Sequence, residues 1–547
     1  MRSIARPSRA RRSGSSRSAG PREGALAIAS GLLLGAAFLP GVPGFVAWGA
    51  FVPLLVALEG RARRSATAGS LFRLGWLFGF VFFLIGTHWI ALLSEVAITV
   101  PWLKYPAWVM AAAYLALYSG LATLLAGLLA RPSGPRNRVV VGDGAAGVPS
   151  RVPLSVAFPV VFLFVEELRA SGEIGFPWFQ PGYTQHAYVP IIQLASLGSV
   201  SLVTLWVVLV NVFLWRALAG RVRLRSALGA LFLVLVPWFW GQRVLQATEG
   251  HAGAPDSSRV VALVQGNVAG EIKWSGKQQP EILATFLRLS GEAAGRRPRP
   301  VLAIWPETAT GSYLRKQIDQ ALAVAGFAAR TGVPVFTGFA DYAWDADGRQ
   351  HAYNAAGLFA VDGTIGPVGA KRHLVPFGER MPFERLFPWL GRLDLGQAEW
   401  TPGERTVLFP SAAGPFACLV CFEAIFPDLS RTDVLLGARW IVNITNDEWF
   451  GNGAALYQHA AMSVFRAVEN RVPLARCANT GLTLVADANG RVLATLPVFQ
   501  PGVLVMELPR SAVLGFPTPY TRFGDWPGLL SLIAVFGLGL RAWARSR

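Results

Sequence analysis

Seven long apolar segments occupy most of the first half of the chain, and an eighth lies close to the C-terminus. Each is near the length that a helix needs to cross about 30 Å of hydrocarbon, the shorter ones only with their flanking residues. Over the whole chain 53% of residues are hydrophobic and 15% are charged, which is typical of a membrane protein. The segments that we expect to be membrane spans are residues 25–39, 45–58, 76–93, 107–129, 152–168, 191–214, 228–240 and 526–540.

Arginine residues are distributed unevenly between the connections of these spans. They gather in the N-terminal tail, in every second connection (Arg61 and Arg216 are examples) and at the C-terminus. The other short connections are nearly free of positive charge, with Lys104 and Arg169 as the exceptions. Because positive residues stay on the cytosolic side, eight spans place both termini in the cytosol. The polar region between spans seven and eight must then lie outside.

This pattern divides the chain into five parts. Residues 1–23 are rich in Arg, Ser and Pro, and we expect a disordered cytosolic tail. Spans one to seven form a membrane domain at 24–245, and a polar domain follows at 257–507. The last span takes 523–541, and a short cytosolic tail closes the chain at 542–547.

The charge, cysteine and histidine content argue against a nucleic-acid-binding protein, a disulfide-rich protein and a metalloprotein. The net charge of +18 does not form a basic face with interleaved aromatic residues, so it does not indicate nucleic-acid binding. Three cysteines, Cys418, Cys421 and Cys477, give no evident disulfide framework. Six scattered histidines show no metal-ligand spacing, and we expect no metal and no cofactor.

The polar domain alternates strands with helices. Two hairpins are predicted by Asp362-Gly363 and Asn489-Gly490, dipeptides that favour tight turns between strands. Strands broken by helices, with hairpins added, predict a layered α/β sandwich. We expect strands at 260–264, 301–305, 333–338, 354–361, 364–371, 416–420, 440–444, 482–486 and 492–496, and helices at 280–290, 318–331 and 454–469.

Three reactive side chains fall at or just after predicted strand ends: Glu307, Lys371 and Cys421. A thiolate is a strong nucleophile, a carboxylate can take and return its proton, and an ammonium can stabilise negative charge at an attacked carbonyl. Taken singly, Glu307 and Lys371 are typical of surface charges, and a lone cysteine is more often a packed small residue. Cys418 lies inside the predicted strand, where thiols are commonly inert.

Four local motifs carry a resemblance to a known family. They are WPE at 305–307, KRHLVPFGE at 371–379, CFE at 421–423 and NITNDEWFG at 443–451. Together they resemble the nitrilase (carbon-nitrogen hydrolase) superfamily, and with eight spans the chain is similar to its membrane branch, the bacterial apolipoprotein N-acyltransferases. One departure is Phe422, where this family often has Tyr, which removes a hydroxyl donor.

The resemblance implies a Glu-Lys-Cys triad. Glu307 would be general base and acid, Cys421 would attack the ester carbonyl of a phospholipid acyl chain, and Lys371 would hold the oxyanion. The α-amine of a diacylglyceryl-cysteine apolipoprotein would then take the acyl group from the thioester. Glu379 and Glu423 would orient the triad or the amine, and Trp449 would line the substrate pocket.

The same resemblance implies a multi-pass protein of the bacterial cytoplasmic (inner) membrane, with the catalytic domain on the periplasmic side. Its partners would be a phospholipid acyl donor and a diacylglyceryl apolipoprotein acceptor, and no nucleic acid is expected. We expect a monomer. Trp178 and Phe179, in the aromatic outer loop GFPWFQPGY, are candidates for lipid contact or for anchoring at the interface.

Two other functions fit parts of the sequence. A membrane-tethered amidase or nitrilase acting on a small soluble substrate would use the same fold. A lipid transporter with a catalytically idle outer domain is less favoured, because the spans lack the paired Gly-broken segments and central ion-site charges of many transporters.

Overall fold

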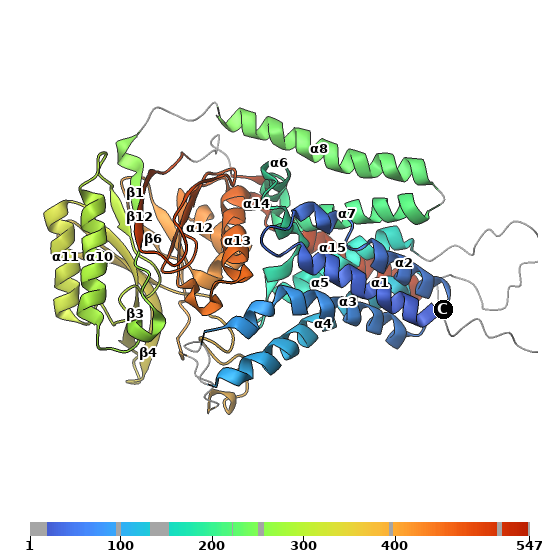
Figure 1. Cartoon of the computed structure of the whole chain (residues 1–547), viewed down its shortest axis with the longest axis horizontal. Helices are drawn as coiled ribbons and strands as arrows, with labels where there is room; N and C mark the ends of the chain where they lie inside the picture. The colour runs from blue at the N-terminus through green and yellow to red at the C-terminus, as the bar shows by residue number, and fades with distance from the viewer. Residues whose placement is uncertain are drawn as a thin grey trace, which may run out of the picture.

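The computed structural model describes residues 19–94, 100–131, 152–220, 222–249, 256–384, 386–392, 398–510 and 517–544. A helical bundle and an α/β domain lie side by side along the longest axis (Figure 1). The bundle is built from the two ends of the chain and the α/β domain from the segment between them.

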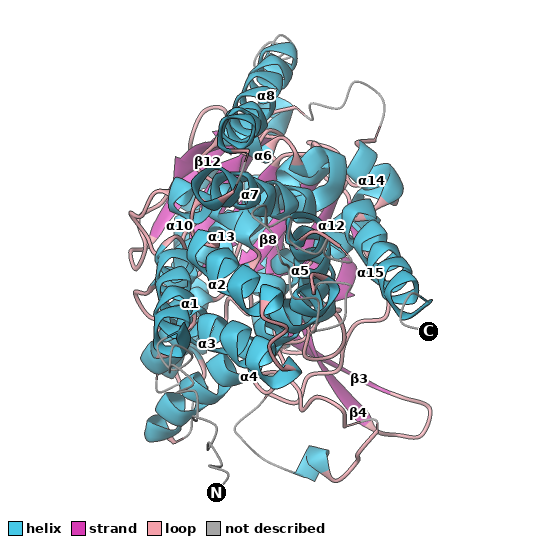
Figure 2. Cartoon of the chain, turned by 90° about the vertical axis from the view of Figure 1, so that its right-hand side faces the viewer, coloured by secondary structure: helices cyan, strands magenta, loops and turns pink. Residues whose placement is uncertain are grey.

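Every segment predicted to be a span is largely helical. The helices of the bundle are α1 Ala19–Ala36, α2 Val52–Arg63, α3 Ala68–Gly86, α4 Lys104–Leu129, α5 Leu154–Ala170, α7 Ala195–Ala219, α8 Arg223–Glu249 and α15 Trp526–Ala544, with the short α6 Val189–Ile192 and α14 Pro519–Phe523. Viewed from the bundle side, most of these helices are grouped together and α8 stands at the edge (Figure 2).

Length and apolarity mark five helical stretches of the described chain as able to cross a membrane. They are Gly44–Arg63, Ala68–Leu92, Pro101–Leu129, Ala195–Ala219 and Arg223–Thr248. Trp526–Arg541 is apolar but shorter. The protein therefore has the helices of a membrane protein, and the count of eight spans stays a prediction.

Close approach of α3 and α4 shows how the bundle packs. A methyl group at Gly75 would come within 2.2 Å of the Ser119 carbonyl oxygen, so only glycine fits there. The Thr123 hydroxyl on α4 donates to the Leu71 carbonyl on α3 at 2.9 Å. Small residues and side-chain hydroxyls at helix crossings are typical of packing in a bilayer, where apolar burial alone favours no contact.

Several boundaries differ from the predictions for physical reasons. Helix α1 begins at Ala19, inside the predicted tail 1–23, because Glu23 pairs with Arg61 of α2 at 2.9 Å and extends the packed helix. The rest of that tail, 1–18, lies outside the described residues. Helix α7 is interrupted at Gly198 and Ser199, whose backbone angles are not helical.

The α/β domain contains two sheets of six strands each, in the orders β12-β1-β2-β3-β4-β5 and β11-β10-β9-β8-β7-β6. The strands of the first sheet are β1 Val260–Gln265, β2 Leu302–Ile304, β3 Val335–Trp344, β4 Gln350–Phe359, β5 Ile365–Ala370 and β12 Gly502–Glu507. Those of the second are β6 Leu408–Phe409, β7 Phe416–Val420, β8 Trp440–Thr445, β9 Leu474–Ala478, β10 Leu484–Ala486 and β11 Val492–Thr495.

Helices cover the outer face of each sheet, which makes four layers (Figure 1). Helices α10 Gln279–Ala294 and α11 Ile318–Thr331 pack on the first sheet, and α12 Pro427–Leu435 and α13 Ala454–Asn470 on the second. Apolar side chains from both sheets, such as Leu263, Phe336 and Val442, fill the space between them. The predicted α/β sandwich is therefore confirmed, including its two hairpins.

Helix α13 lies between the second sheet and the bundle (Figure 1). One of its faces packs on the sheet through residues such as Val464. Phe465 and Met462 on the other face join the same apolar core as the bundle helices. The two parts of the protein are therefore joined by a continuous core, and the ends of β7 and β8 lie at this junction.

Candidate active site

The three predicted triad residues come together just beyond strand ends. Glu307 follows β2, Lys371 follows β5 directly, and Cys421 follows β7 directly. Their exposed fractions are 5%, 1% and 7%. Three reactive side chains buried at one place, each fixed by the end of a strand, are the arrangement that covalent catalysis needs.

Cys421 has a strained backbone. Its φ of 51° lies in the left-handed region, which costs a non-glycine residue about 1–3 kcal/mol and is found mainly at functional sites. The strand turns there into the short helix Cys421–Ile425. The Glu423 carboxylate accepts a hydrogen bond of 2.7 Å from the Val420 N–H and so closes the turn.

Glu307 is held by three groups. One carboxylate oxygen accepts from the Asn354 amide at 2.8 Å and from the Lys371 ammonium at 3.4 Å. The other oxygen accepts from the Asn446 N–H at 2.9 Å. All three partners are hydrogen-bond donors, and together they fix the position of both carboxylate oxygens.

Lys371 lies between two carboxylates. Its ammonium is 2.8 Å from a Glu379 oxygen and 3.4 Å from a Glu307 oxygen. Burial lowers the pKa of Lys371, but the charges of Glu379 and Glu307 outweigh it and raise the pKa above its ordinary value. Lys371 therefore stays a cation, as an oxyanion partner must.

The Cys421 thiol is protonated in the resting protein. Burial raises its pKa well above the ordinary value, and Glu307 adds to the rise, while Lys371 acts in the opposite direction. A buried thiol of this kind is a weak nucleophile until a base removes its proton. The chemistry at Cys421 therefore requires Glu307 or an equivalent group.

Glu379 and Glu423 support the triad in different ways. Glu379 bonds the Lys371 ammonium and also accepts from the Val375 N–H at 2.8 Å. Glu423 is 1% exposed and accepts from the N–H groups of Arg372 and His373 at 2.6 and 3.2 Å. Glu423 thus fixes the loop after Lys371 against the Cys421 turn.

The structure adds residues that were not predicted from the sequence. Lys273 is fully buried and donates to the Glu307 carbonyl at 3.1 Å, and burial lowers its pKa to about 8. Asn354 and Asn446 hold the Glu307 carboxylate. Asn446 lies in the NITNDEWFG motif and could have been inferred from it, whereas no signal marked Lys273 or Asn354.

One group of described side chains has the composition of a metal site. Donor atoms of Cys421, Asp447 and His459 lie within 4.8 Å of one another. The Asp447 carboxylate accepts from Arg476 at 2.6 Å and from the Thr445 hydroxyl at 2.8 Å. Its oxygens are therefore engaged, and the Arg476 cation opposes a second positive charge, so this group fits a hydrogen-bond network better than a metal.

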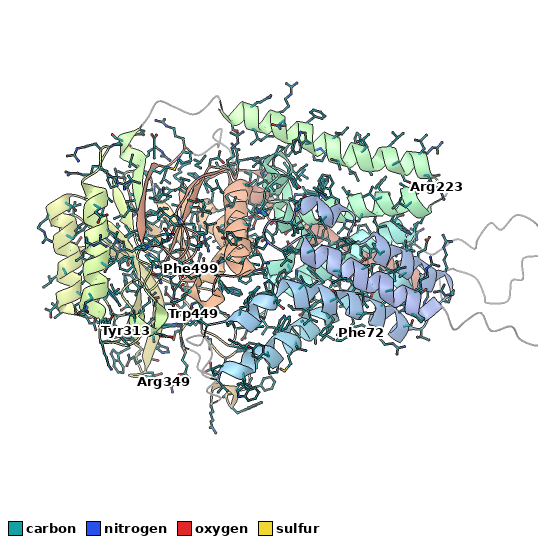
Figure 3. The ribbon with its side chains drawn as sticks, viewed as in Figure 1. Phe72, Arg223, Tyr313, Arg349, Trp449 and Phe499 are labelled. Carbon is teal, nitrogen blue, oxygen red and sulfur yellow. The ribbon has the colours of Figure 1, made fainter. Side chains whose placement is uncertain are left out.

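The predicted substrate contacts lie at the junction of the two parts. Trp449 is partly exposed, lies beside the bundle (Figure 3), and accepts at its carbonyl from the Ser94 N–H at 3.3 Å. Trp178 is 1% exposed and packs against Phe450. Phe179 is buried among bundle aromatics such as Phe82. Their role in substrate binding stays a prediction.

Two sheets in a four-layer α/β sandwich, with Glu, Lys and Cys at strand ends, define a carbon-nitrogen hydrolase domain, here attached to a membrane bundle. The carbon-nitrogen hydrolase family model matches residues 260–516. The model of the apolipoprotein N-acyltransferase N-terminal domain matches residues 30–213. The chain belongs to the apolipoprotein N-acyltransferase family.

Three relatives show this family membership over nearly the whole chain, and each is named apolipoprotein N-acyltransferase. The protein of Geobacter metallireducens is 35% identical over 95% of this chain and 96% of its own. That of Brucella melitensis is 33% identical, covering 92% of each chain. That of Chlorobaculum tepidum is 30% identical, covering 93% of this chain and 96% of its own.

Solved structures give a more distant likeness. An amidase from Nesterenkonia sp. AN1 is 20% identical and covers 47% of this chain and 92% of its own, with a TM-score of 0.35. A likeness this distant carries no argument about the present chain.

Proposed function

We propose that this protein moves a fatty acyl chain from a membrane phospholipid to the N-terminal α-amine of a diacylglyceryl-cysteine apolipoprotein, through a thioester on Cys421. The observation that carries the proposal is the buried contact of Glu307 and Lys371 beside the strained Cys421 turn. That turn lies where the α/β domain meets the bundle, since Phe422 and Phe426 belong to the bundle core.

The first half-reaction makes the thioester. Glu307 takes the proton of the Cys421 thiol, and the sulfur attacks the ester carbonyl of the phospholipid. Lys371 stabilises the negative charge that develops on the carbonyl oxygen. When the carbon–oxygen ester bond breaks, Glu307 returns the proton to the departing oxygen, and a lysophospholipid leaves.

The second half-reaction makes the amide. The apolipoprotein amine attacks the thioester carbonyl, and Glu307 accepts a proton from the amine. The carbon–sulfur bond breaks, the proton goes to the Cys421 sulfur, and the N-acylated product leaves. Because the three triad side chains are buried, water has little access to the thioester and aminolysis is favoured over hydrolysis.

The bundle gives this chemistry its location. Each methylene taken out of the bilayer costs about 0.8 kcal/mol, so both lipid substrates must be met at the membrane. The start of α8, at Arg223, lies at the end of the bundle remote from the α/β domain (Figure 3). With Arg-rich connections on the cytosolic side, this arrangement supports a catalytic domain on the periplasmic face of the inner membrane.

Mass analysis of the intact protein tests the proposal. After incubation with a diacyl phospholipid in detergent micelles, we expect the mass to increase by one fatty acyl chain on Cys421. Adding a diacylglyceryl lipopeptide should remove that acyl chain and yield the N-acylated lipopeptide. Release of ammonia from small amides, without need of lipid and without an acyl adduct, would instead support the tethered amidase and overturn the proposal.

A glycine against the proposed base gives a second prediction. A methyl group at Gly338 would lie 2.8 Å from the Glu307 Cα and 2.8 Å from the Thr308 nitrogen. Gly338→Ala should lower the free energy of unfolding by about 1–3 kcal/mol. It should also slow acylation of Cys421 more than about tenfold, because Glu307 is displaced.

The measurements are the thermal midpoint in detergent and the rate of acyl-enzyme formation. Gly291→Ala is the matched control, because nothing lies within 4 Å of the methyl group that it adds to α10. That control should be unchanged or slightly more stable. An unimpaired Gly338→Ala protein would show that the strand end can adjust without moving the carboxylate.

A further inference from the structure

The Cys421 carbonyl has a buried partner that the proposed mechanism does not use. The Nε2 atom of His459, on α13, lies 3.0 Å from the Cys421 carbonyl oxygen, and His459 is fully buried. A carbonyl can only accept a hydrogen bond, so Nε2 must carry the proton. This contact fixes the peptide plane that follows Cys421, in a residue whose φ of 51° is strained.

The other ring nitrogen of His459 is set by two charged neighbours. Nδ1 lies 3.0 Å from an Asp447 oxygen and 3.1 Å from the Arg476 guanidinium. Burial lowers the pKa of His459, and Arg476 lowers it further, while Asp447 opposes them. Asp447 and Arg476 thus hold the ring at Nδ1, and Nε2, which faces an acceptor, carries a proton toward the Cys421 carbonyl.

The face of the His459 ring is in contact with the membrane domain. It stacks on Trp178, with ring centroids 5.4 Å apart and planes 27° apart. Trp178 belongs to the turn Pro177–Phe179, between helices α5 and α7. Its indole N–H donates to the neighbouring Gln458 at 2.8 Å, and the Gln458 amide donates to the Phe38 carbonyl at 3.0 Å.

We propose that His459 is a positioning residue that holds the Cys421 carbonyl. Because its ring stacks on Trp178, the geometry of the Cys421 thiol then depends on the position of the turn Pro177–Phe179 of the membrane domain. The inference rests on the nucleophilic role proposed for Cys421. It gives Trp178 a role in aligning the nucleophile from the membrane side, separate from contact with lipid.

Two substitutions at His459 separate positioning from packing. His459→Phe keeps a ring against Trp178 but cannot donate to the Cys421 carbonyl. His459→Gln keeps an N–H donor at a similar reach. We expect His459→Phe to lower the rate of Cys421 acylation at saturating phospholipid by about 100-fold, as a misplaced reacting group does, with KM unchanged. His459→Gln should recover most of that loss.

A readout without lipid keeps this test separate from the proposed function. The rate at which iodoacetamide alkylates Cys421, followed by peptide mass mapping, should change in His459→Phe and return toward wild type in His459→Gln. This result would support the positioning role even if the wild-type protein formed no acyl-enzyme. His351→Phe, on the hairpin of β3 and β4, is the matched control and should behave as wild type.

A double-mutant cycle tests whether the geometry of Cys421 depends on the turn that carries Trp178. Trp178→Ala should slow acylation in the wild-type background but add little in His459→Phe, because the two act through one contact. Fully additive losses would overturn the coupling. Wild-type acylation and alkylation in His459→Phe, or losses in both His459 variants that follow only their thermal midpoints, would overturn the positioning role.

Discussion

Replacing Cys421 with alanine is expected to abolish acyl transfer. Without the sulfur no thioester can form, and loss of a nucleophile from a group that acts as a unit typically lowers the rate by about 10⁴-fold or more. The variant should show no acyl adduct by intact mass and no N-acylated lipopeptide. Alanine keeps the Cβ and therefore the same backbone strain, and only one sulfur atom is lost, so the thermal midpoint should change little.

The other two cysteines are matched controls in the same chain. Cys477 is fully buried between the sheets, where its sulfur lies 3.2 Å from the Ile304 carbonyl, and burial raises its pKa above the ordinary value. Cys418 lies inside β7, three residues before the turn. Cys418→Ala and Cys477→Ala should keep the acyl adduct. An acylated lipopeptide made by Cys421→Ala would mean that the proposed mechanism is wrong.

Local patterns in the sequence predicted the elements that carry the site. The strand at 416–420 and the helix at 318–331 have the predicted bounds, and Asp362-Gly363 forms its hairpin. Each depends on features within one segment: an apolar run, a helical period, or a turn residue that accepts positive φ. The three proposed triad residues were singled out partly for the same reason, because each follows a predicted strand, and partly from the family motifs around them.

Features that depend on distant contacts could not be predicted in this way. Helix α7 is interrupted at Ser199, where the Glu469 carboxylate of α13 accepts from the Ser199 hydroxyl at 2.9 Å and from the Val200 N–H at 3.1 Å. Glu469 lies 270 residues from Ser199 in the chain, so this interruption does not appear in a local pattern.

The same limit applies to the supporting residues of the site. Lys273, Asn354 and His459 are isolated polar residues whose partners, Glu307 and Cys421, lie at least 34 residues away in the chain. A single Lys or His in a sequence is typical of the surface. Only the fold shows that these are buried and directed at the triad.

Glu307→Gln is the second substitution that should have a large effect. The glutamine has nearly the same shape but cannot take the thiol proton, so acylation should slow by about 10²–10⁴-fold. One of its two polar atoms must be an NH₂ group facing donors of Asn354 or Asn446, which should cost about 1–3 kcal/mol of stability. Glu292→Gln, at an exposed position of α10, is the matched control and should act as wild type.

The pH dependence of the remaining rate distinguishes a lost base from a damaged site. Burial raises the pKa of the Cys421 thiol most, the Glu307 carboxylate adds to the rise and Lys371 opposes it, so removing the carboxylate should lower the thiol pKa but leave it above its ordinary value. Thiolate then forms as pH rises, and acylation by Glu307→Gln should increase from about pH 6 to about pH 9. Wild-type protein, which uses the carboxylate, should change much less over this range. A variant whose rate stays equally low at every pH would show that the substitution has displaced Cys421 or Lys371, and the assignment of Glu307 as the base would then lose its support.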